Sequence, residues 1–393
     1  MLGRPEIRVG GNSQDRLWPT APLPHGEKQV ATKPYYHALH CLARMRLPLL
    51  VGLNLLGRDP QAAGDLLAQV AYEVPPSQLT IALGNEPDLY GSRLPAPGDY
   101  AGYLELYGHT LEALRGRFGG FLPPIAGPDP ATWRWTSQTS HFISDEHPAV
   151  ADEHLYGLNG CAQRTGSPTY PTVSQLLSPF ASTDVVKALL PVVRSARAAA
   201  IPAQISETNS VACSGLPGVS DTPASAVWAL SLLGSAARAG FSRVEFHNST
   251  GAYDALVLRK GRIVFRPLWS AIVLADRLWP AGSRPLRLRG TLASGLAGWV
   301  ARRPDGSLGV LVVNRNRAHR KRITLRTTGV ATLGRLLPRG SRAVTLDGQT
   351  LAWAHGRPAW HGRRLVRQLP PSAGGTVSAS LPPVSAAWLV IRR

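Results

Sequence analysis

Two glutamates stand where a carboxyl group could carry out acid–base or nucleophilic chemistry. Glu86 lies in Asn85-Glu86-Pro87, directly after the apolar run 81–83, and Glu207 directly follows a strand-like run that ends at Ser206. Retaining glycoside hydrolysis needs such a pair: one carboxyl protonates the leaving oxygen, and the other attacks the anomeric carbon. The spacing therefore raises the hypothesis of a glycoside-cleaving site.

A glutamate at a strand end can also have a purely structural role, in which it forms an ion pair with an arginine or caps a helix. For one isolated glutamate, that structural role would be the preferred interpretation. Here two glutamates stand at matching strand ends, and Asn85 directly precedes one of them. An asparagine there can donate a hydrogen bond to a sugar 2-hydroxyl, a contact that strengthens in the transition state. The combination favours Glu86 and Glu207 as catalytic residues and Asn85 as a substrate-binding residue.

The elements that must position these residues alternate between strands and helices over the first 280 residues. Strand-like runs end at Gly10, Val51, Leu83, Ala126, His154, Ser206 and Phe246. Helical stretches are expected at about 33–46, 60–73, 99–116, 173–200, 222–239 and 267–278, with a poorly helical crossover at 132–145. Asp59-Pro60 is typical of a helix start, and Gly240 of a helix end.

Strands separated by helices predict parallel βαβ units and an α/β fold. The pattern gives seven of the eight strands of a (β/α)8 TIM barrel, with the first strand missing. A doubly wound sheet is the alternative, but the first turn, Gly10-Gly11-Asn12, lacks the spacing of a phosphate-binding loop. In a barrel numbered this way, Glu86 and Glu207 follow strands 4 and 7 and face each other across the mouth.

Charge divides the chain at about residue 280. The chain carries 43 Lys+Arg and 24 Asp+Glu, and residues 281–393 hold 20 of the basic residues but only two acidic ones, Asp305 and Asp347. We therefore predict a catalytic barrel over 1–280 and a basic antiparallel β-sandwich over 281–393. Asp305-Gly306 and Asp347-Gly348 each predict a hairpin between flanking strands.

A surface this basic attracts polyanions. Contact with an acidic polysaccharide is the functional interpretation, centred on a basic cluster of six residues: Arg315, Arg317, Arg320, Lys321, Arg322 and Arg326. The alternative is a solvated strand edge whose charges oppose aggregation. No zinc-finger spacing or aromatic RNA-binding motif is present, so nucleic acid is not expected. The sequence contains no run of 18 apolar residues, so no membrane span is predicted.

Several stretches resemble glycoside hydrolase family 79, the heparanase and β-glucuronidase family of retaining barrel enzymes. The matching stretches are Arg8-Val9-Gly10-Gly11-Asn12-Ser13-Gln14-Asp15, Gly84-Asn85-Glu86-Pro87, 154–160, Glu207-Thr208-Asn209-Ser210, 218–222, 344–348 and 381–392. The Asn-Glu-Pro motif is shared widely among related families, whereas the Arg-Val-Gly-Gly-Asn-Ser and Glu-Thr-Asn-Ser stretches together are more specific.

The resemblance implies roles for individual positions. Glu86 matches the acid/base and Glu207 the nucleophile. The remaining matches are substrate-binding positions: Asn12 and Ser13 at the glucuronate ring, His154 and Tyr156 beside the nucleophile, and Tyr253 with the Ser214-Gly215 loop at the uronate carboxylate. Tyr156 is expected to hydrogen-bond Glu207. Backbone N–H groups and a tyrosine hydroxyl suit a carboxylate because they bring no competing charge.

The function implied is retaining hydrolysis of β-glucuronides in a glucuronic-acid-containing glycan, with no cofactor. The histidines, His154 among them, lack metal-ligand spacing with acidic partners, so no metal is expected. Two alternatives remain: a catalytically silent carbohydrate-binding remnant, since the first strand is missing, and a β-glucosidase-like enzyme of the same clan. Family members have a strand and helix before the Arg-Val-Gly-Gly segment, and usually a signal peptide. Neither is visible in this chain, so secretion is expected only if the full-length protein carries a signal.

Cysteine and tryptophan positions leave alternatives open. Cys161 and Cys213 fall in loops of the active face, where they either form a disulfide or remain free thiols. Cys41 lies in a helix and is expected in the core. Trp133 and Trp135 either form a sugar-stacking platform or belong to the core.

Overall fold

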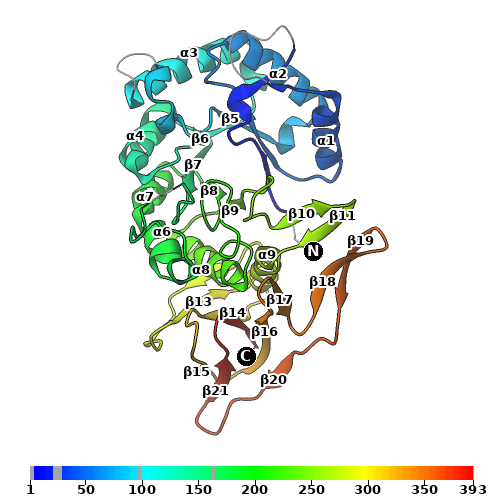
Figure 1. Cartoon of the computed structure of the whole chain (residues 1–393). Coiled ribbons are helices and arrows are strands. Elements are labelled where there is room, and N and C mark those ends of the chain that lie inside the picture. The colour runs from blue at the N-terminus through cyan, green and yellow to red at the C-terminus, as the bar shows by residue number, and fades with distance from the viewer. Residues whose placement is uncertain (1–3, 21–28, 95–98, 162–163, 393) are drawn as a thin grey trace.

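The computed structural model describes residues 4–20, 29–94, 99–161 and 164–392. A parallel seven-stranded sheet with helices outside it forms the N-terminal part, and an antiparallel sheet domain lies below it (Figure 1). The parallel strands, in their spatial order, are β1 Ile7–Val9, β4 Leu49–Leu53, β5 Leu79–Leu83, β6 Ile125–Pro128, β7 Val150–Leu155, β8 Ala203–Thr208 and β9 Arg243–Phe246. The predicted architecture, seven strands of a TIM-like barrel plus an antiparallel domain, is confirmed.

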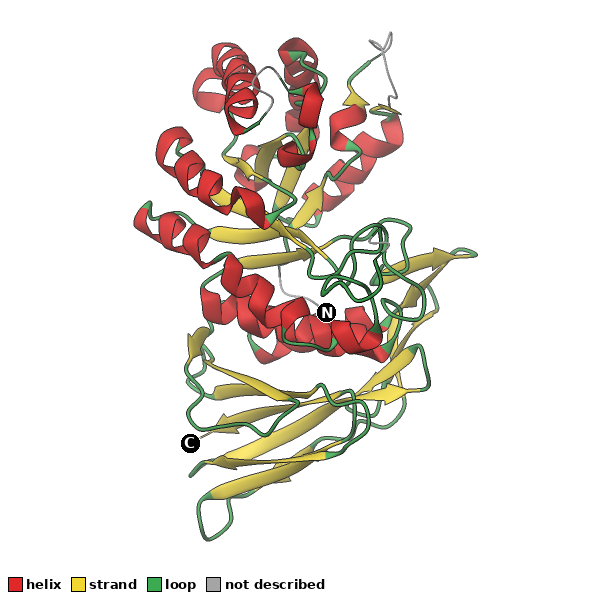
Figure 2. Ribbon diagram, turned by 60° about the vertical axis from the view of Figure 1, so that its left-hand side comes forward, coloured by secondary structure: helices red, strands yellow, loops and turns green. Residues whose placement is uncertain are grey.

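Helices cover the outside of this sheet (Figure 2). Their bounds are α1 Lys33–Arg44, α2 Pro60–Glu73, α3 Tyr100–Phe118, α4 Thr136–Glu146, α5 Val173–Leu176, α6 Val185–Ala188, α7 Leu190–Ala198, α8 Pro223–Ala239 and α9 Pro267–Leu278. Strand β4 is buried at every residue because both of its faces are covered. Leu50, Ala82, Ala126 and Val150 form a small apolar cluster of their own in the sheet.

The predicted helix signals work as expected at both ends. The Asp59 side chain accepts a hydrogen bond from Ala62 N at 2.9 Å, and Pro60 occupies the first helical position of α2. Gly240 ends α8 with φ 109°, a left-handed conformation that a glycine adopts without strain.

Two predicted crossovers are wrong in detail. The stretch 173–200 is not one helix but α5, a π-helical turn at Phe180–Asp184, α6 and α7, because Pro179 and Pro191 lack the N–H that a continuous helix needs. The stretch 132–145, expected to be poorly helical, contains α4 and a 3₁₀ turn at Trp133–Trp135.

The parallel sheet stays open between β1 and β9. In the part of the chain that the structure describes, these two strands form no backbone ladder with each other. Side chains connect them instead: Arg243 of β9 forms an ion pair with Glu6, just before β1, at 3.1 Å. The two sheet edges therefore lie within side-chain reach.

The C-terminal domain is built on one antiparallel sheet, in the order β12-β13-β14-β22-β16-β17, with β20 also paired to β16. The strands are β12 Arg284–Leu286, β13 Leu296–Arg302, β14 Leu308–Asn314, β16 Val330–Arg339, β17 Ala343–Leu346, β20 Arg367–Leu369 and β22 Ser385–Arg392. One face, including Leu311 and Leu336, joins the same apolar core as α8 and α9. The other face, including Val312 and Leu333, packs against the pair β15 Lys321–Arg326 and β21 Thr376–Leu381.

Of the two predicted hairpins, the one at Asp305-Gly306 forms, joining β13 to β14. At Asp347-Gly348 the predicted turn forms, with positive φ at both residues and an antiparallel bridge between Leu346 and Gln349, but the flanking strands pair no further. β17 pairs with β16, and the strand after the turn, β18 Thr350–Ala354, pairs with β19 Arg357–His361. The Asp347 side chain accepts hydrogen bonds from Arg335 N and Trp388 Nε1, both at 2.9 Å. These bonds fix the turn against the main sheet, and β18 does not join that sheet.

Two members of the predicted basic cluster hold the domains together. Arg315 donates hydrogen bonds to Ser231, Ser182 and Thr183 at 3.0–3.3 Å, and burial lowers its pKa to about 10. Arg317 donates to Ser174 at 2.9 Å. These two guanidinium groups are therefore used at the domain interface, whereas Arg320, Arg322 and Arg326 are exposed.

Replacing Arg315 tests this interface. We expect Arg315→Ala to lower the free energy of unfolding by about 1–3 kcal/mol, because three hydrogen bonds to one buried charged group are lost. Arg326→Ala, at an exposed position of the same domain, should change it by less than about 0.5 kcal/mol. Urea denaturation of both variants measures the difference, and equal effects would contradict the interface role.

Candidate active site

A cavity of about 1030 Å³ opens at the carboxyl ends of the parallel strands. It is lined by eight of the ten predicted site residues: Asn12, Ser13, Glu86, His154, Tyr156, Glu207, Ser214 and Tyr253. Asn85 is 3% exposed and lies behind the wall, and Gly215 also stands outside the lining. Residues from five strand ends, far apart in the sequence, thus meet around one space.

The segment that carries Glu86 is held tightly from below. Asp15 accepts hydrogen bonds from Asn85 N at 3.1 Å and from Tyr90 Oη at 2.6 Å, and burial raises the pKa of Asp15 to about 6. Glu86 itself has φ 52° and its N–H donates to the Asp129 carbonyl at 3.0 Å. A non-glycine residue held in this left-handed region is typical of functional sites.

Glu207 is surrounded by cationic and hydroxyl groups. Its carboxylate accepts hydrogen bonds from Arg8 at 2.7 Å and Tyr156 at 2.9 Å, and His247 Nδ1 lies at 2.9 Å. Burial alone would raise the pKa of Glu207, but His154, His247 and Arg8 hold it well below its usual range. The group is therefore an ionised carboxylate, as a nucleophile requires.

The tyrosine contact expected from the resemblance is present. Tyr156 is the donor to Glu207, and burial together with the neighbouring carboxylate raises the pKa of Tyr156 well above its ordinary value. The hydroxyl therefore keeps its proton and orients one oxygen of Glu207. A carboxyl oxygen of Glu86 lies within 4.8 Å of one of Glu207.

The loops after β8 and β9 meet at the predicted carboxylate-binding position. Ala252 N donates to Ser214 O at 2.7 Å, and Ser214 and Tyr253 both face the cavity. Gly215 has φ 78°, and a Cβ there would lie 2.7 Å from Tyr253 N. Glycine is thus required for the close approach of the two loops.

Cys161 and Cys213 form a disulfide that joins the loops after β7 and β8, directly before Ser214. This settles the alternative that the sequence left open. The expectation for Cys41 is wrong: its thiol is exposed on α1, because Leu39 and Ala43 take the buried positions of that helix.

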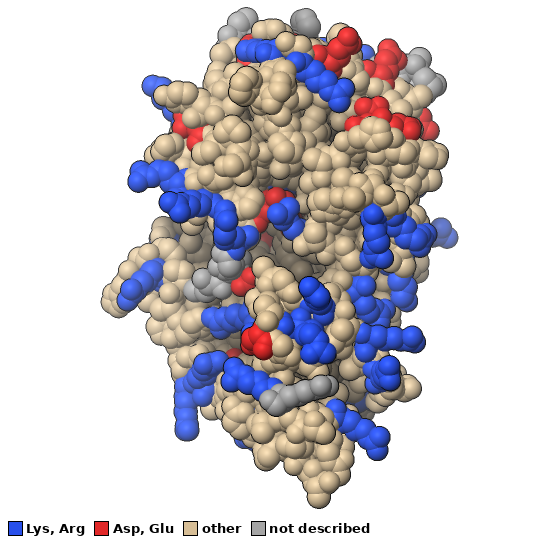
Figure 3. Space-filling view, turned by 180° about the vertical axis from the view of Figure 1, so that it is seen from behind, with Lys and Arg blue, Asp and Glu red and all other residues tan. Residues whose placement is uncertain are grey.

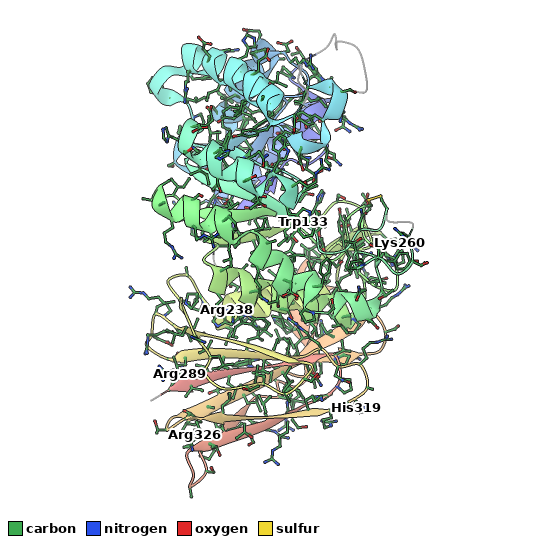
Figure 4. The ribbon with its side chains drawn as sticks, turned by 90° about the vertical axis from the view of Figure 1, so that its left-hand side faces the viewer. Trp133, Arg238, Lys260, Arg289, His319 and Arg326 are labelled. Atoms are coloured by element: carbon green, nitrogen blue, oxygen red, sulfur yellow. A yellow bond between two sulfur atoms is a disulfide. The ribbon has the colours of Figure 1, made fainter. Side chains whose placement is uncertain are left out.

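The two tryptophans divide between the alternatives. Trp133 lines the cavity with 60% of its surface exposed, on the side of the barrel where the long loops gather (Figure 4). Trp135 is 4% exposed and packs edge-on against Tyr100 at 5.3 Å, so it belongs to the core.

Three site residues were not assigned from the sequence: Arg8, Asp129 and His247. Arg8 donates to Glu207 at 2.7 Å, to Asn85 at 2.9 Å and to Asp129 at 2.6 Å. A charged residue inside the strand run 7–9 was the available signal for Arg8. Asp129 directly follows β6, and His247 directly follows β9, so strand-end position was the signal for both.

One group in the described residues could offer three metal ligands, namely Glu86, His154 and Glu207. Both ring nitrogens of His154 are engaged, Nδ1 with Glu86 at 3.0 Å and Nε2 with Asp129 at 2.8 Å. Burial opposes a charged imidazole, but Asp129 and Glu207 raise the pKa of His154 well above its ordinary value. Arg8 and His154 thus supply positive charge where an ion would lie.

No protein-family model and no curated sequence matches the chain. Among solved structures, it is similar to a 4-O-α-L-rhamnosyl-β-D-glucuronidase from Fusarium oxysporum, with a TM-score of 0.73 and 20% identity over 99% of this chain and 88% of that one. The chain is also similar to a family 51 arabinofuranosidase from Xanthomonas axonopodis, with a TM-score of 0.66 and 13% identity over 99% of this chain and 87% of that one. For a family 44 endoglucanase from Clostridium acetobutylium, the TM-score is 0.63 and the identity 12%, over 100% of this chain and 94% of that one. The likeness shows a fold found in glycoside hydrolases.

Within the described ranges, no helix is long and apolar enough to cross a membrane.

The ion pairs of Arg8 predict a pH-dependent contribution to stability. Arg8 and its two carboxylate partners are nearly fully buried, and the pKa values of both carboxyls lie below their usual range. We expect Arg8→Met to lower the free energy of unfolding at pH 7 by about 3–5 kcal/mol, since two buried carboxylates lose their cation.

The sign of the pH dependence follows from linkage. A carboxyl whose pKa is lowered on folding adds stability above its unfolded pKa, and that stability is lost as the pH falls through the folded value. The difference between wild type and Arg8→Met should therefore shrink steadily below about pH 4. Denaturation at pH 7, 5 and 3 measures it, and a difference independent of pH would contradict the ion-pair explanation.

Proposed function

We propose that the chain is a retaining glycoside hydrolase that cleaves β-linked glucuronides, with Glu207 as nucleophile and Glu86 as acid/base. The observation that carries this proposal is the separation of the two carboxyl groups, whose nearest oxygens lie within 4.8 Å. Retaining enzymes place them about 5–5.5 Å apart, whereas inverting enzymes leave about 6.5–9.5 Å for a water molecule. The close pair leaves no room for that water.

In the first step, Glu207 attacks the anomeric carbon while Glu86 gives its proton to the departing oxygen. In the second step, Glu86 takes a proton from water, whose oxygen attacks the same carbon and releases Glu207. Arg8 and Tyr156 suit Glu207 to this role, because they keep it ionised and fix its orientation. Asn85 donates to Asn12 at 3.0 Å and so supports the cavity wall from behind.

The uronate carboxylate is assigned to Tyr253 and the Ser214 loop. Both line the cavity near Glu207, and neither brings an acidic group of its own that would repel the ligand. The glucuronidase among the similar structures supports the same substrate class. Trp133, exposed at the cavity wall, is placed to stack on a sugar beyond the cleaved bond.

The basic C-terminal domain is proposed to attract acidic polysaccharide outside the cavity. On the face that Figure 3 shows, Lys and Arg side chains are spread over this half of the molecule with few Asp or Glu between them. Their charge acts at long range and is screened by salt, so they affect capture of the polymer and not the choice of sugar in the cavity.

Catalysis is tested on purified protein with aryl β-glucuronides. Glu207→Ala should abolish turnover, and azide should restore part of it by acting as an external nucleophile. Glu86→Ala should lose most of its kcat/KM on poor leaving groups but little on good ones, which need no protonation in the first step. Glu105→Ala, exposed on α3, is the matched control that should leave the rate unchanged. Near-wild-type rates for both active-site variants would contradict the assignment.

Substrate charge is tested with a matched pair of aryl glucuronide and aryl glucoside. Sites built to hydrogen-bond a substrate group reject analogues lacking it by up to ~10⁴ in kcat/KM. We expect such a preference for the glucuronide at both low and high salt. Equal rates on both sugars would favour the β-glucosidase-like alternative, and sugar binding without turnover would favour the carbohydrate-binding remnant.

A further inference from the structure

A continuous path of charged contacts runs beneath the cavity and joins the two catalytic carboxyl groups. Glu207 accepts from Arg8 Nη1 at 2.7 Å, and Arg8 Nη2 donates to Asp129 Oδ2 at 2.6 Å. Asp129 Oδ1 lies 2.8 Å from His154 Nε2, an ion pair and not an aligned hydrogen bond. His154 Nδ1 then lies 3.0 Å from Glu86 Oε1. Every group between the two glutamates is at most 7% exposed.

Asp129 is the centre of this path and controls Glu86 by two routes. Its backbone carbonyl accepts the N–H of Glu86, and its carboxylate faces the imidazole that contacts the Glu86 side chain. The carboxylate is fixed further by Ser206 Oγ, which donates at 2.6 Å. Burial would raise the pKa of Asp129, but Arg8 and His154 hold it well below its usual range.

The other acidic groups near His154 do not compete for its charge. Burial raises the pKa of Glu153 to about 8 and that of Asp152 well above its ordinary value, so burial disfavours the charged form of both. Glu245, on β9, is raised in the same way. Asp88, whose pKa burial also raises, accepts hydrogen bonds from Ala131 N and Thr132 Oγ1, both at 2.7 Å.

The charges in the path therefore balance as two cations, Arg8 and His154, against two anions, Asp129 and Glu207. Glu86 is the remaining carboxyl, and it meets the cationic imidazole. Without Asp129, a fully buried His154 would have lost one of the two carboxylates that hold its proton.

We propose that Asp129 is the positioning residue of acid–base catalysis, holding His154 cationic against Glu86 so that Glu86 can both release and recover its proton. The inference rests on the proposed glycosidase function. When Glu86 gives its proton to the leaving oxygen, the carboxylate it becomes is stabilised by His154 at 3.0 Å. When Glu207 is esterified and loses its charge, Arg8 keeps Asp129 as its anion, so the path stays paired through both steps.

Asp129→Asn tests the role because it keeps the shape and removes the charge. We expect kcat on a glycoside with a poor leaving group to fall about 10–100-fold, because acid–base assistance is weakened. KM should change by less than about twofold, since Asp129 does not line the cavity. On a dinitrophenyl glycoside, whose leaving group needs no proton, the loss in kcat/KM should disappear, because kcat/KM reports the first step and not the second. The alkaline limb of the kcat/KM profile should move to higher pH, because Glu86 no longer faces a cation.

The matched control is Asp65→Asn, which removes an ion-paired aspartate from the outer helices, 2.7 Å from Arg117. It should leave kcat, KM and the pH profile unchanged. Should Asp129→Asn fail to fold, Ser206→Ala removes only one hydrogen bond to the same carboxylate. It should move the leaving-group dependence and the alkaline limb in the same direction by a smaller amount.

A second readout needs no turnover. The imidazole of His154, assigned in NMR spectra by comparison with His154→Gln, should lose its proton at a lower pH in Asp129→Asn than in the wild type. Equal losses on poor and good leaving groups, or an imidazole unaffected by the substitution, would overturn the proposal while wild-type turnover still supports the glycosidase function. A wild type without turnover would instead contradict the proposed function itself.

Discussion

A single buried guanidinium organises the site. Arg8 lies on β1 and reaches Glu207 from β8, Asn85 from the segment after β5, and Asp129 from the end of β6. Burying a cation is costly unless its partners are close and charged, and here two carboxylates meet that requirement within 2.7 Å. The placement of the groups around Glu207 depends on this guanidinium, which also helps His154 and His247 to keep Glu207 ionised.

Arg8 lies on a strand that is paired along one edge only. β1 has only three residues and pairs with β4 alone among the described strands, so its other edge faces β9 without a ladder. The Glu6–Arg243 ion pair spans that gap at 3.1 Å. Glu6 and Arg8 are two residues apart on the same short segment. The ion pair that spans the open edge and the contacts beneath the cavity therefore both depend on the placement of β1.

The C-terminal domain also contributes to the site, although none of its described residues line the cavity. Arg315 binds the π-helical turn at Ser182 and Thr183, and the residues beside that contact, Phe180 and Val185, line the cavity. The shape of one cavity wall thus depends on a hydrogen-bonded contact between domains. A basic residue that looks, in the sequence, like part of a polyanion surface serves here as an interdomain anchor.

The sequence by itself determined the strand–helix alternation, the antiparallel character of the basic tail and the two glutamates at strand ends, because periodicity, caps and turn residues act over a few positions. It did not determine which polar residues meet. Arg8, Asp129 and His247 are separated by more than a hundred residues each and look like ordinary strand-end or strand residues until the barrel brings them together. The strand pairing around Asp347-Gly348, the burial of Trp135 and the interdomain contacts of Arg315 were likewise decided by packing partners distant in the chain. Burial and the neighbouring charges together set which of these groups are ionised, and both are properties of the folded barrel and not of any local stretch.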